Sequence, residues 1–304
     1  MVEFKRFRYF LICAEELHFT RAAEKLGIAQ PPLSQQIKLL EREIGTKLFN
    51  RTTRGVELTR AGESLLSDVR AILAASKRAI VTAQQIGRGE AGSIRVGFTG
   101  SVALNPLLSR VFAGFRQAYP LVDVQLAEST TRASLEALRN GQLDFGFIRP
   151  SEVELDDMFG QCIHKERMYA AVPIEHPLAS SEAIQLSDLS REAFVLYPRA
   201  NGQALYDAVI GACQRSGFSP RIVQEAPQMT STVSLVAAGV GVTLVTESMR
   251  QLHNSRVRYL GLVGVAPVAE TYLVRRVRPV SPIMMSFQTV VASILAADAG
   301  NMIA

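Results

Sequence analysis

Four polar side chains lie close together early in the chain: Gln30, Ser34, Gln35 and Lys38. Ser34 and Lys38 are four residues apart, so on a helix they share a face. Glutamine amides hydrogen-bond the edges of bases, and a lysine ammonium reaches guanine acceptors or a phosphate. If this stretch begins a helix, its side chains are suited to contact nucleic acid.

Three arginines, Arg51, Arg54 and Arg60, surround a short turn-forming segment, residues 52–55. Guanidinium groups suit a phosphate or the minor groove, and such contacts position a protein on DNA more than they read its sequence. We expect the arginines to flank a hairpin that follows the polar stretch.

A second group of polar residues follows three expected strands, where strands end and helices begin. Hydroxyls and free backbone N–H groups at helix starts form anion sites, and an arginine adds a fork for a carboxylate. Each residue alone reads equally well as a helix N-cap or a surface arginine, and their meeting at one sheet edge favours a ligand site. The candidates are Thr99, Gly100, Ser101, Thr130, Thr131 and Arg149.

No arrangement typical of catalysis or metal binding occurs. The four histidines are widely spread, and the HExxH, CxxC and GxSxG motifs are absent from the sequence. Gly239-Val240-Gly241 lacks the third glycine of a dinucleotide fingerprint and lies between a helix and a strand, the wrong order. We therefore expect no enzyme, no metal and no cofactor.

Composition and charge agree with a protein that meets a polyanion at one end. Residues 1–92 carry 15 Lys and Arg against 10 Asp and Glu, whereas residues 93–304 carry 18 of each. Three separated cysteines fit neither a disulfide framework nor a zinc site. Without a signal peptide or an apolar run of about 18–20 residues, we expect a cytoplasmic protein.

The elements around the first polar group follow a helix-turn-helix plan. We expect a helix over residues 20–26 with Thr20 as N-cap, a turn from Gly27, and a second helix from Gln30 to Glu43 that ends at Gly45. Pro31 and Pro32 are tolerated in its first turn. An ordinary helical hairpin with a solvated polar face is the open alternative. The faces expected to pack together hold Leu33, Ile37, Leu40 and Ile44 on one helix and Ala22, Ala23 and Leu26 on the other.

A long amphipathic helix is expected over residues 59–85, with apolar residues at three- and four-residue spacing. It pairs with a partner helix or packs on its own domain. Glycines end it at residues 87–92, and strands then alternate with helices to the end of the chain, which predicts a largely parallel sheet.

The N-terminal stretch resembles the winged helix-turn-helix of LysR-type transcriptional regulators. The residues that carry the resemblance are Phe19, Thr20, Ala22, Ala23, Leu26, Gln30, Pro31, Ser34, Ile37, Leu40, Glu41, Gly45, Leu48, Phe49, Arg51, Leu58, Thr59, Ala61 and Gly62. The benzoate/muconate and chlorocatechol regulators are the branch it is most similar to.

The resemblance implies a multidomain α/β fold in three parts: a winged helix-turn-helix over residues 1–60, a dimerising linker helix and hinge over 59–89, and an effector-binding domain over 92–304. The last part would resemble a periplasmic binding protein, with subdomain I at about 92–162 and 268–304 and subdomain II at about 163–267. The chain would cross between them near 149–162 and 262–270.

The resemblance also implies functions for the candidate residues. Gln30, Pro31, Pro32, Ser34, Gln35, Lys38, Arg51 and Arg54 would contact an inverted-repeat operator as part of a homodimer or homotetramer that works with RNA polymerase. Ser101, Thr131 and Arg149 fall on the effector-binding pattern, and residues 196–199, Gln203 and Leu205 would line the other side of the cleft. Leu205 stands where the benzoate-responsive pattern has an aromatic residue. We expect a small organic anion, a mono- or dicarboxylate.

Two alternatives stay open at this point. A solute-binding protein would fit the C-terminal two-thirds, although not residues 1–62. A thiol redox sensor of the same family would need a close pair of cysteines, whereas Cys162 and Cys213 are far apart in sequence and lack an obvious activating cation.

Overall fold

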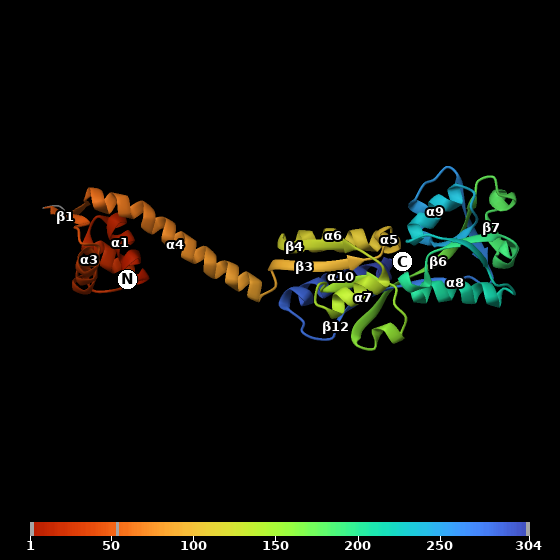
Figure 1. Cartoon of the computed structure of the whole chain (residues 1–304). Helices are drawn as coiled ribbons and strands as arrows, with labels where there is room; N and C mark the ends of the chain where they lie inside the picture. The colour runs from red at the N-terminus through yellow and green to blue at the C-terminus, as the bar shows by residue number, and fades with distance from the viewer. Residues whose placement is uncertain (1–2, 53–54, 302–304) are drawn as a thin grey trace. The chain divides into compact units, whose positions relative to one another are not determined.

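The computed structural model describes residues 3–52 and 55–301, and they divide into two units after Gln85. The first unit is mostly helical and carries a two-stranded hairpin (Figure 1). Its elements are α1 (Phe4–Glu16), α2 (Phe19–Leu26), α3 (Gln30–Ile44), β1 (Phe49–Thr52), β2 (Gly55–Leu58) and most of α4 (Arg60–Gly87).

The ends of α2 and α3 are set by capping residues. Gly27 and Gly45 adopt the left-handed backbone that ends each helix, with φ of 66° and 80°. The expectation that Thr20 caps α2 is wrong. His18 Nδ1 accepts a hydrogen bond from the Thr20 backbone N–H at 3.2 Å, so the cap lies two residues earlier.

The core of the first unit forms where three helices and the hairpin meet. Leu33, Ile37 and Leu40 of α3 pack with Ala22 and Ala23 of α2, as their spacing predicts. Ile44 is 38% exposed, so it lies outside this core, contrary to expectation.

Helix α4 is partly packed and partly exposed. Leu65, Val69 and Leu73 contact the core of the first unit, which bears out own-domain packing for the first half of the helix. Ile80 and Ile86, further along the expected stripe, are exposed. The second half therefore presents apolar side chains to solvent in the single chain.

The second unit begins with three parallel strands in the order β4-β3-β5. Two helices, α6 and α10, cover one face through Val111, Phe115 and Phe287, and α7 covers the other through Leu135 and Leu138. The elements, called here lobe I, are β3 (Ala91–Phe98), α5 (Gly100–Ala103), α6 (Pro106–Ala118), β4 (Leu121–Glu128), α7 (Thr131–Arg139), β5 (Phe145–Ile148), η1 (Val153–Leu155) and α10 (Pro282–Asn301).

Two long antiparallel strands, β6 (Met158–Pro173) and β12 (Val268–Arg276), connect lobe I to the rest of the unit. On β6, Met158 and Ile163 belong to the cores of lobe I, whereas residues 168 and 170–172 belong to a separate core. The crossings thus lie inside continuous strands. These strands make the eight-stranded sheet mixed, so the expectation of a largely parallel sheet is wrong.

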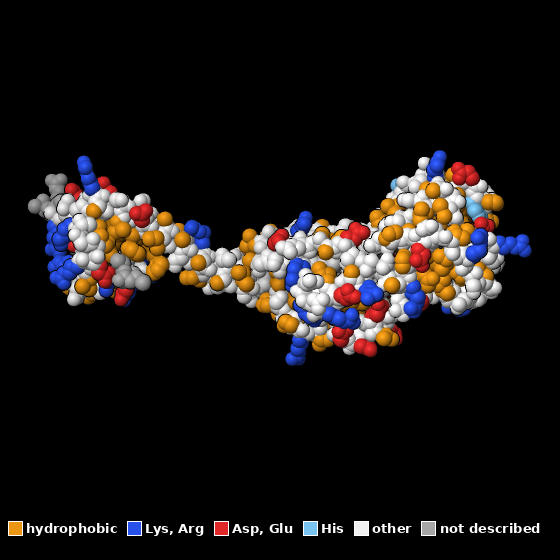
Figure 2. Space-filling model, in the orientation of Figure 1, with side chains coloured by type: hydrophobic (Ala, Val, Ile, Leu, Met, Phe, Trp, Pro, Cys, Tyr) orange, Lys and Arg blue, Asp and Glu red, His pale blue; other side chains and the backbone are white. Residues whose placement is uncertain are grey.

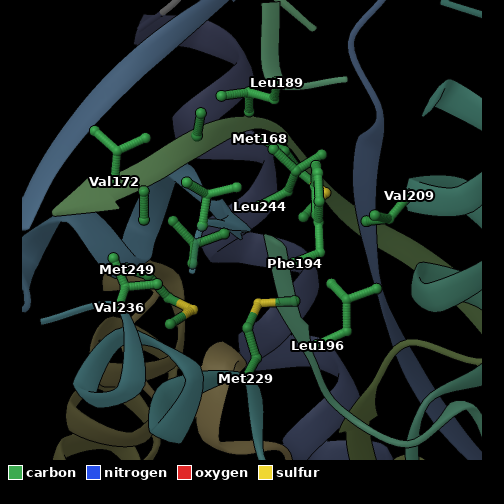
Figure 3. Packing of buried hydrophobic residues seen from close by; sticks show 14 of the residues in the cluster. Met168, Val172, Leu189, Phe194, Leu196, Val209, Met229, Val236, Leu244 and Met249 are labelled. Carbon is green, nitrogen blue, oxygen red and sulfur yellow. The ribbon is translucent and has the colours of Figure 1, made fainter. Parts of the chain in front are cut away.

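The separate core belongs to lobe II, where helices α8 and α9 pack against strands around Phe194, Leu196 and Met229 (Figure 3). The elements of lobe II are η2 (Pro177–Ser180), β7 (Ala183–Gln185), η3 (Leu186–Leu189), β8 (Ala193–Leu196), η4 (Arg199–Asn201), α8 (Gln203–Arg215), β9 (Arg221–Glu225), α9 (Met229–Ala237), β10 (Thr243–Thr246), η5 (Glu247–Gln251) and β11 (Val257–Val263).

Candidate functional site

The expected nucleic-acid contacts lie at the start of α3, on the surface of the first unit. Gln35 and Lys38 are exposed, and so are Pro31 and Pro32 in the first turn. Gln30 and Ser34 are partly exposed. The N-terminal half of α3 therefore presents polar side chains while its opposite face is buried in the core, as a helix that enters a groove must.

The hairpin contacts this surface through Arg51. Its Nη2 donates to Ser34 Oγ at 3.3 Å, so a strand of the hairpin and the polar face of α3 adjoin. Arg54 lies outside the described residues. Lys and Arg side chains gather along one side of the first unit (Figure 2), which is the charge that a phosphate backbone attracts.

The buried carboxylate of Glu41 holds the hairpin against α3. Its Oε1 accepts from the backbone N–H groups of Leu48 and Phe49 at 3.0 and 3.3 Å, and its Oε2 accepts from Lys47 Nζ at 2.9 Å. Burial raises the pKa of the Glu41 carboxyl, but these hydrogen bonds outweigh burial and hold the pKa below its ordinary value. We did not assign this function from the sequence, although an acid next to buried Leu40 is the signal that would have found it.

The second candidate site is a cavity of about 40 Å³ in the second unit, between lobe I and lobe II. Lobe I contributes residues that follow β3, β4 and β5, and lobe II contributes residues that follow β8 and β9. The lining residues are Thr99, Ser101, Thr130, Thr131, Arg149, Tyr197, Asn201, Gly202, Leu205, Pro227, Gln228 and Met229. Six of the eight effector candidates, from segments far apart in sequence, are thus brought together.

Three helices of eight residues or more begin at this cavity. Helix α7 starts at Thr131, α8 at Gln203 just after Gly202, and α9 at Met229. Helix N-termini carry partial positive charge and N–H groups without a partner in the helix. The backbone therefore favours an anion in this cavity.

Arg149 is the charged group of the cavity, and its side chain is 4% exposed. Its Nη2 donates to Glu166 Oε1 at 2.8 Å, and Glu166 Oε2 accepts from the Ser248 backbone N–H at 2.8 Å. Burial lowers the pKa of Arg149, and Glu166 opposes that change. A guanidinium nevertheless stays protonated in proteins, so Arg149 is a cation.

Several buried polar atoms at this site have no hydrogen-bond partner within the described part of the chain. They are Arg149 Nε and Nη1, Tyr197 Oη and Thr99 Oγ1. Buried polar groups in native proteins are almost always paired, so a cluster of unpaired donors calls for an explanation. A bound group with acceptor oxygens would satisfy them.

Two of the eight candidates lie outside the cavity, and a third, Thr130, lines it and also caps a helix. Gly100 and Gln203 do not line the cavity. A Cβ on Gly100 would lie 2.6 Å from Glu128 Oε1, so this glycine permits close packing at the end of β4. Thr130 Oγ1 accepts from the Ala133 N–H at 3.2 Å and serves as the N-cap of α7. Its hydroxyl is therefore already engaged within the helix.

Some lining residues were missed. Asn201, Gly202 and residues 227–229 come from loops whose polar and small residues look ordinary in the sequence. Asn201 Nδ2 donates to the Pro227 carbonyl at 2.9 Å and so joins the two loops. Arg199, in the segment expected to line the cleft, instead pairs with Asp207 and is exposed.

The structure gives little support for a metal site, a reactive thiol or a membrane span. Within residues 3–52 and 55–301, no group of His, Cys, Asp and Glu could hold a metal ion. Burial raises the pKa of Cys13 to about 12 and that of Cys213 to about 11, which disfavours the reactive thiolate. Among the helices described, none is both long and apolar enough to cross a membrane.

Comparison with known proteins decides the family. Residues 4–63 match the bacterial regulatory helix-turn-helix protein, lysR family, and residues 87–294 match the LysR substrate binding domain. The chain belongs to the LysR family of transcriptional regulators. It is thus a DNA-binding regulator with an effector-binding domain and not an enzyme. The free-standing solute-binding protein is excluded as an alternative.

Relatives and solved structures of LysR regulators cover nearly the whole chain. The uncharacterized HTH-type transcriptional regulator YnfL of Escherichia coli is 38% identical over 90% of this chain and 92% of its own. The regulator CatR of Pseudomonas putida is 37% identical over 96% and 99%. The crystal structure of full-length CbnR complexed with its target DNA superposes with a TM-score of 0.84, at 27% identity, over 97% of this chain and all of that one.

Proposed function

We propose that this LysR-family regulator binds an inverted-repeat operator through the start of α3 and the hairpin. Gln30, Ser34, Gln35 and Lys38 would read base edges, with Pro31 and Pro32 at the entry of the helix. Arg51 and Arg54 would contact the phosphate backbone or the minor groove of the DNA. The proposal rests on the exposed polar face of α3 beside Arg51.

The effector in this proposal is a small organic anion with a carboxylate. The observation that carries it is the set of unpaired donors on Arg149, Tyr197 and Thr99 in one buried cavity. A carboxylate only accepts hydrogen bonds, so it matches a cavity lined by donors and helix N-termini. About 40 Å³ is room for roughly three water molecules, which favours an acid of few atoms.

The proposal also covers the oligomeric state of the protein and its branch of the LysR family. Exposed Ile80 and Ile86 on α4 suit a partner helix, so we infer a homodimer through α4 and a homotetramer that contacts RNA polymerase on the DNA. The chain is 38% identical to YnfL and 37% identical to CatR, and these values are too similar to assign it to one branch of the family. The class of effector is therefore inferred from the residues that line the pocket. We further propose three parts: a DNA-binding domain over residues 1–60, a linker helix and hinge over 59–89, and an effector-binding domain over 92–304. We also propose a cytoplasmic location, where bacterial DNA lies.

A footprint on the DNA upstream of the regulator's own gene tests the proposed function. We expect protection by the full-length protein, and a protected region that changes in length with one acid from a panel of carboxylates and aromatic acids. Absence of protection even at low salt, where phosphate contacts hold, would contradict DNA binding at this site.

Two variants test the assigned contacts in the same assay. Gln35→Ala should cost about 1–3 kcal/mol at the operator and relax sequence preference, because it removes contacts to a base edge. Arg51→Ala should weaken operator and random DNA alike and lower the salt slope by about one unit. Equal losses of Gln35→Ala on operator and random DNA would contradict base reading.

A further inference from the structure

Tyr197 occupies a fixed place in the wall of the cavity. It follows β8 directly, and its ring packs edge-on to that of Tyr206 with centroids 6.2 Å apart. A Cβ on Gly202 would lie 3.4 Å from Tyr197 Cε2, so the ring packs closely against the start of α8. The position of Tyr197 is therefore determined by its surroundings and does not depend on a ligand.

The hydroxyl of Tyr197 is buried without a partner. The residue is 6% exposed, and Oη has no hydrogen-bond partner in the described protein. Burial raises the pKa of the Tyr197 phenol, so the hydroxyl keeps its proton at neutral pH and can donate. Buried tyrosine hydroxyls usually find a partner, and nothing structural supplies one here.

The same cavity holds the free donors of Arg149. Arginine can only donate, and Nη2 is already bound to Glu166, which leaves Nε and Nη1. A ligand oxygen that accepts from Arg149 and also from Tyr197 would pair both groups at once. Charge-assisted hydrogen bonds of this kind are stronger than those between neutral groups.

The ring of Tyr197 also bounds the space. Together with Leu205 and Met229 it forms the apolar part of the wall on the lobe II side. Leu205 and Met229 are part of the buried core of lobe II, so this wall of the cavity is rigid. A longer acid would have to displace well-packed side chains.

We propose that Tyr197 determines effector specificity: its hydroxyl donates to the carboxylate held by Arg149, and its ring limits the length of the acid. This inference rests on the proposed carboxylate effector. It assigns two functions to Tyr197: the residue recognises the anion together with Arg149, and it excludes larger acids.

Titration of the full-length regulator with sodium acetate, propanoate, butanoate, hexanoate and benzoate tests the inference, by calorimetry and by melting temperature. The wild type should prefer the shortest acids. Tyr197→Phe keeps the ring and loses the donor, so it should bind those acids at least about tenfold more weakly with the same length preference. Tyr197→Leu should lose affinity for short acids and gain it for hexanoate or benzoate.

Tyr206→Phe is the matched control, because it removes a hydroxyl from the neighbouring ring, which does not line the cavity. It should bind the acids as the wild type does. Equal affinity of Tyr197→Phe and wild type would overturn the donor role, and an unchanged length preference in a folded Tyr197→Leu would overturn the size role. A wild type that footprints its promoter but binds none of the acids would overturn this inference and leave DNA binding intact.

Discussion

At the scale of single residues, the proposed effector pocket contains a buried ion pair, Arg149 with Glu166. Arg149 could be located from the sequence because it follows a buried strand, where arginine is rare. Glu166 could not, because it lies in a run of polar residues, 164–167, and its partner is 17 residues away. Tyr197 lay in a segment we considered, but only the fold shows that its hydroxyl is buried and that it lines the same cavity as Arg149.

Glu166→Gln should destabilise the second unit and strengthen its response to acids. The loss of a buried partner charge costs about 3–5 kcal/mol, which lowers the melting temperature by about 6–20 °C. Arg149 would then have no anion beside it, so added acetate should raise the melting temperature more than in the wild type.

Arg139→Gln serves as the comparison, because it breaks the exposed pair of Arg139 with Asp157. Its melting temperature should fall by about 3 °C or less. If Glu166→Gln melted like Arg139→Gln, the buried pair would not stabilise the unit as we argue.

At the scale of elements, helices with clear end signals were predicted well and the crossing strands were not. Gly27 and Gly45 end α2 and α3 where expected because only glycine adopts their backbone angles at low cost. Nothing in the sequence marks β6 as one long strand, because residues 164–167 are all polar and interrupt any regular alternation of polar and apolar residues. The antiparallel pairing with β12 is a contact between residues about 100 apart, which local patterns do not reveal.

The hairpin of the DNA-binding unit should depend on Glu41 in a pH-dependent way. Because hydrogen bonds hold its folded-state pKa below the ordinary 4.5, the carboxylate stabilises the fold above about pH 4.5. That stabilisation is lost as the pH falls through the folded-state value. At pH 7, Glu41→Gln should therefore melt at a lower temperature than the wild type, because its free energy of unfolding is lower by about 1–3 kcal/mol. The difference between the two proteins should shrink as the pH falls toward 3.

The measurement is a pair of melting curves at several pH values, with operator affinity at pH 7. Glu41→Gln should also bind the operator more weakly, since the hairpin that carries Arg51 loses its attachment to α3. Glu24→Gln on the exposed side of α2 is a suitable control. A gap that stays constant from pH 7 to pH 3 would show that the carboxylate charge is not what matters.

At the scale of the whole molecule, the sequence located both functional parts because charge, helix signals and strand ends are local properties. The assembly follows from what the fold leaves uncovered. Ile80 is 57% exposed on α4 and lies in the stripe that the sequence predicts for a partner helix. An exposed apolar stripe of this kind is costly in a lone chain, which favours a second copy.

Ile80→Glu should convert the proposed dimer into a monomer, because it places a charge in the apolar stripe. Sedimentation velocity would follow the mass, and the operator footprint should weaken because the second half-site is no longer held nearby. Lys77→Glu adds the same acid to an exposed position outside the stripe and should leave the mass unchanged. A dimeric Ile80→Glu protein would refute pairing through this part of α4.

Strand β3 also has a mechanical consequence. It begins at Ala91, shortly after α4 ends at Gly87, and it runs without a break to Phe98, next to Thr99 in the pocket wall. Hydrogen bonds to β4 and β5 hold it on both sides, so a pull along its axis loads those bonds in shear. Close-packed interiors are stiff and transmit strain. Tension transmitted through α4 would therefore reach the pocket wall along β3, and the unfolding force measured with a probe attached at Gly87 should change when a ligand occupies the pocket.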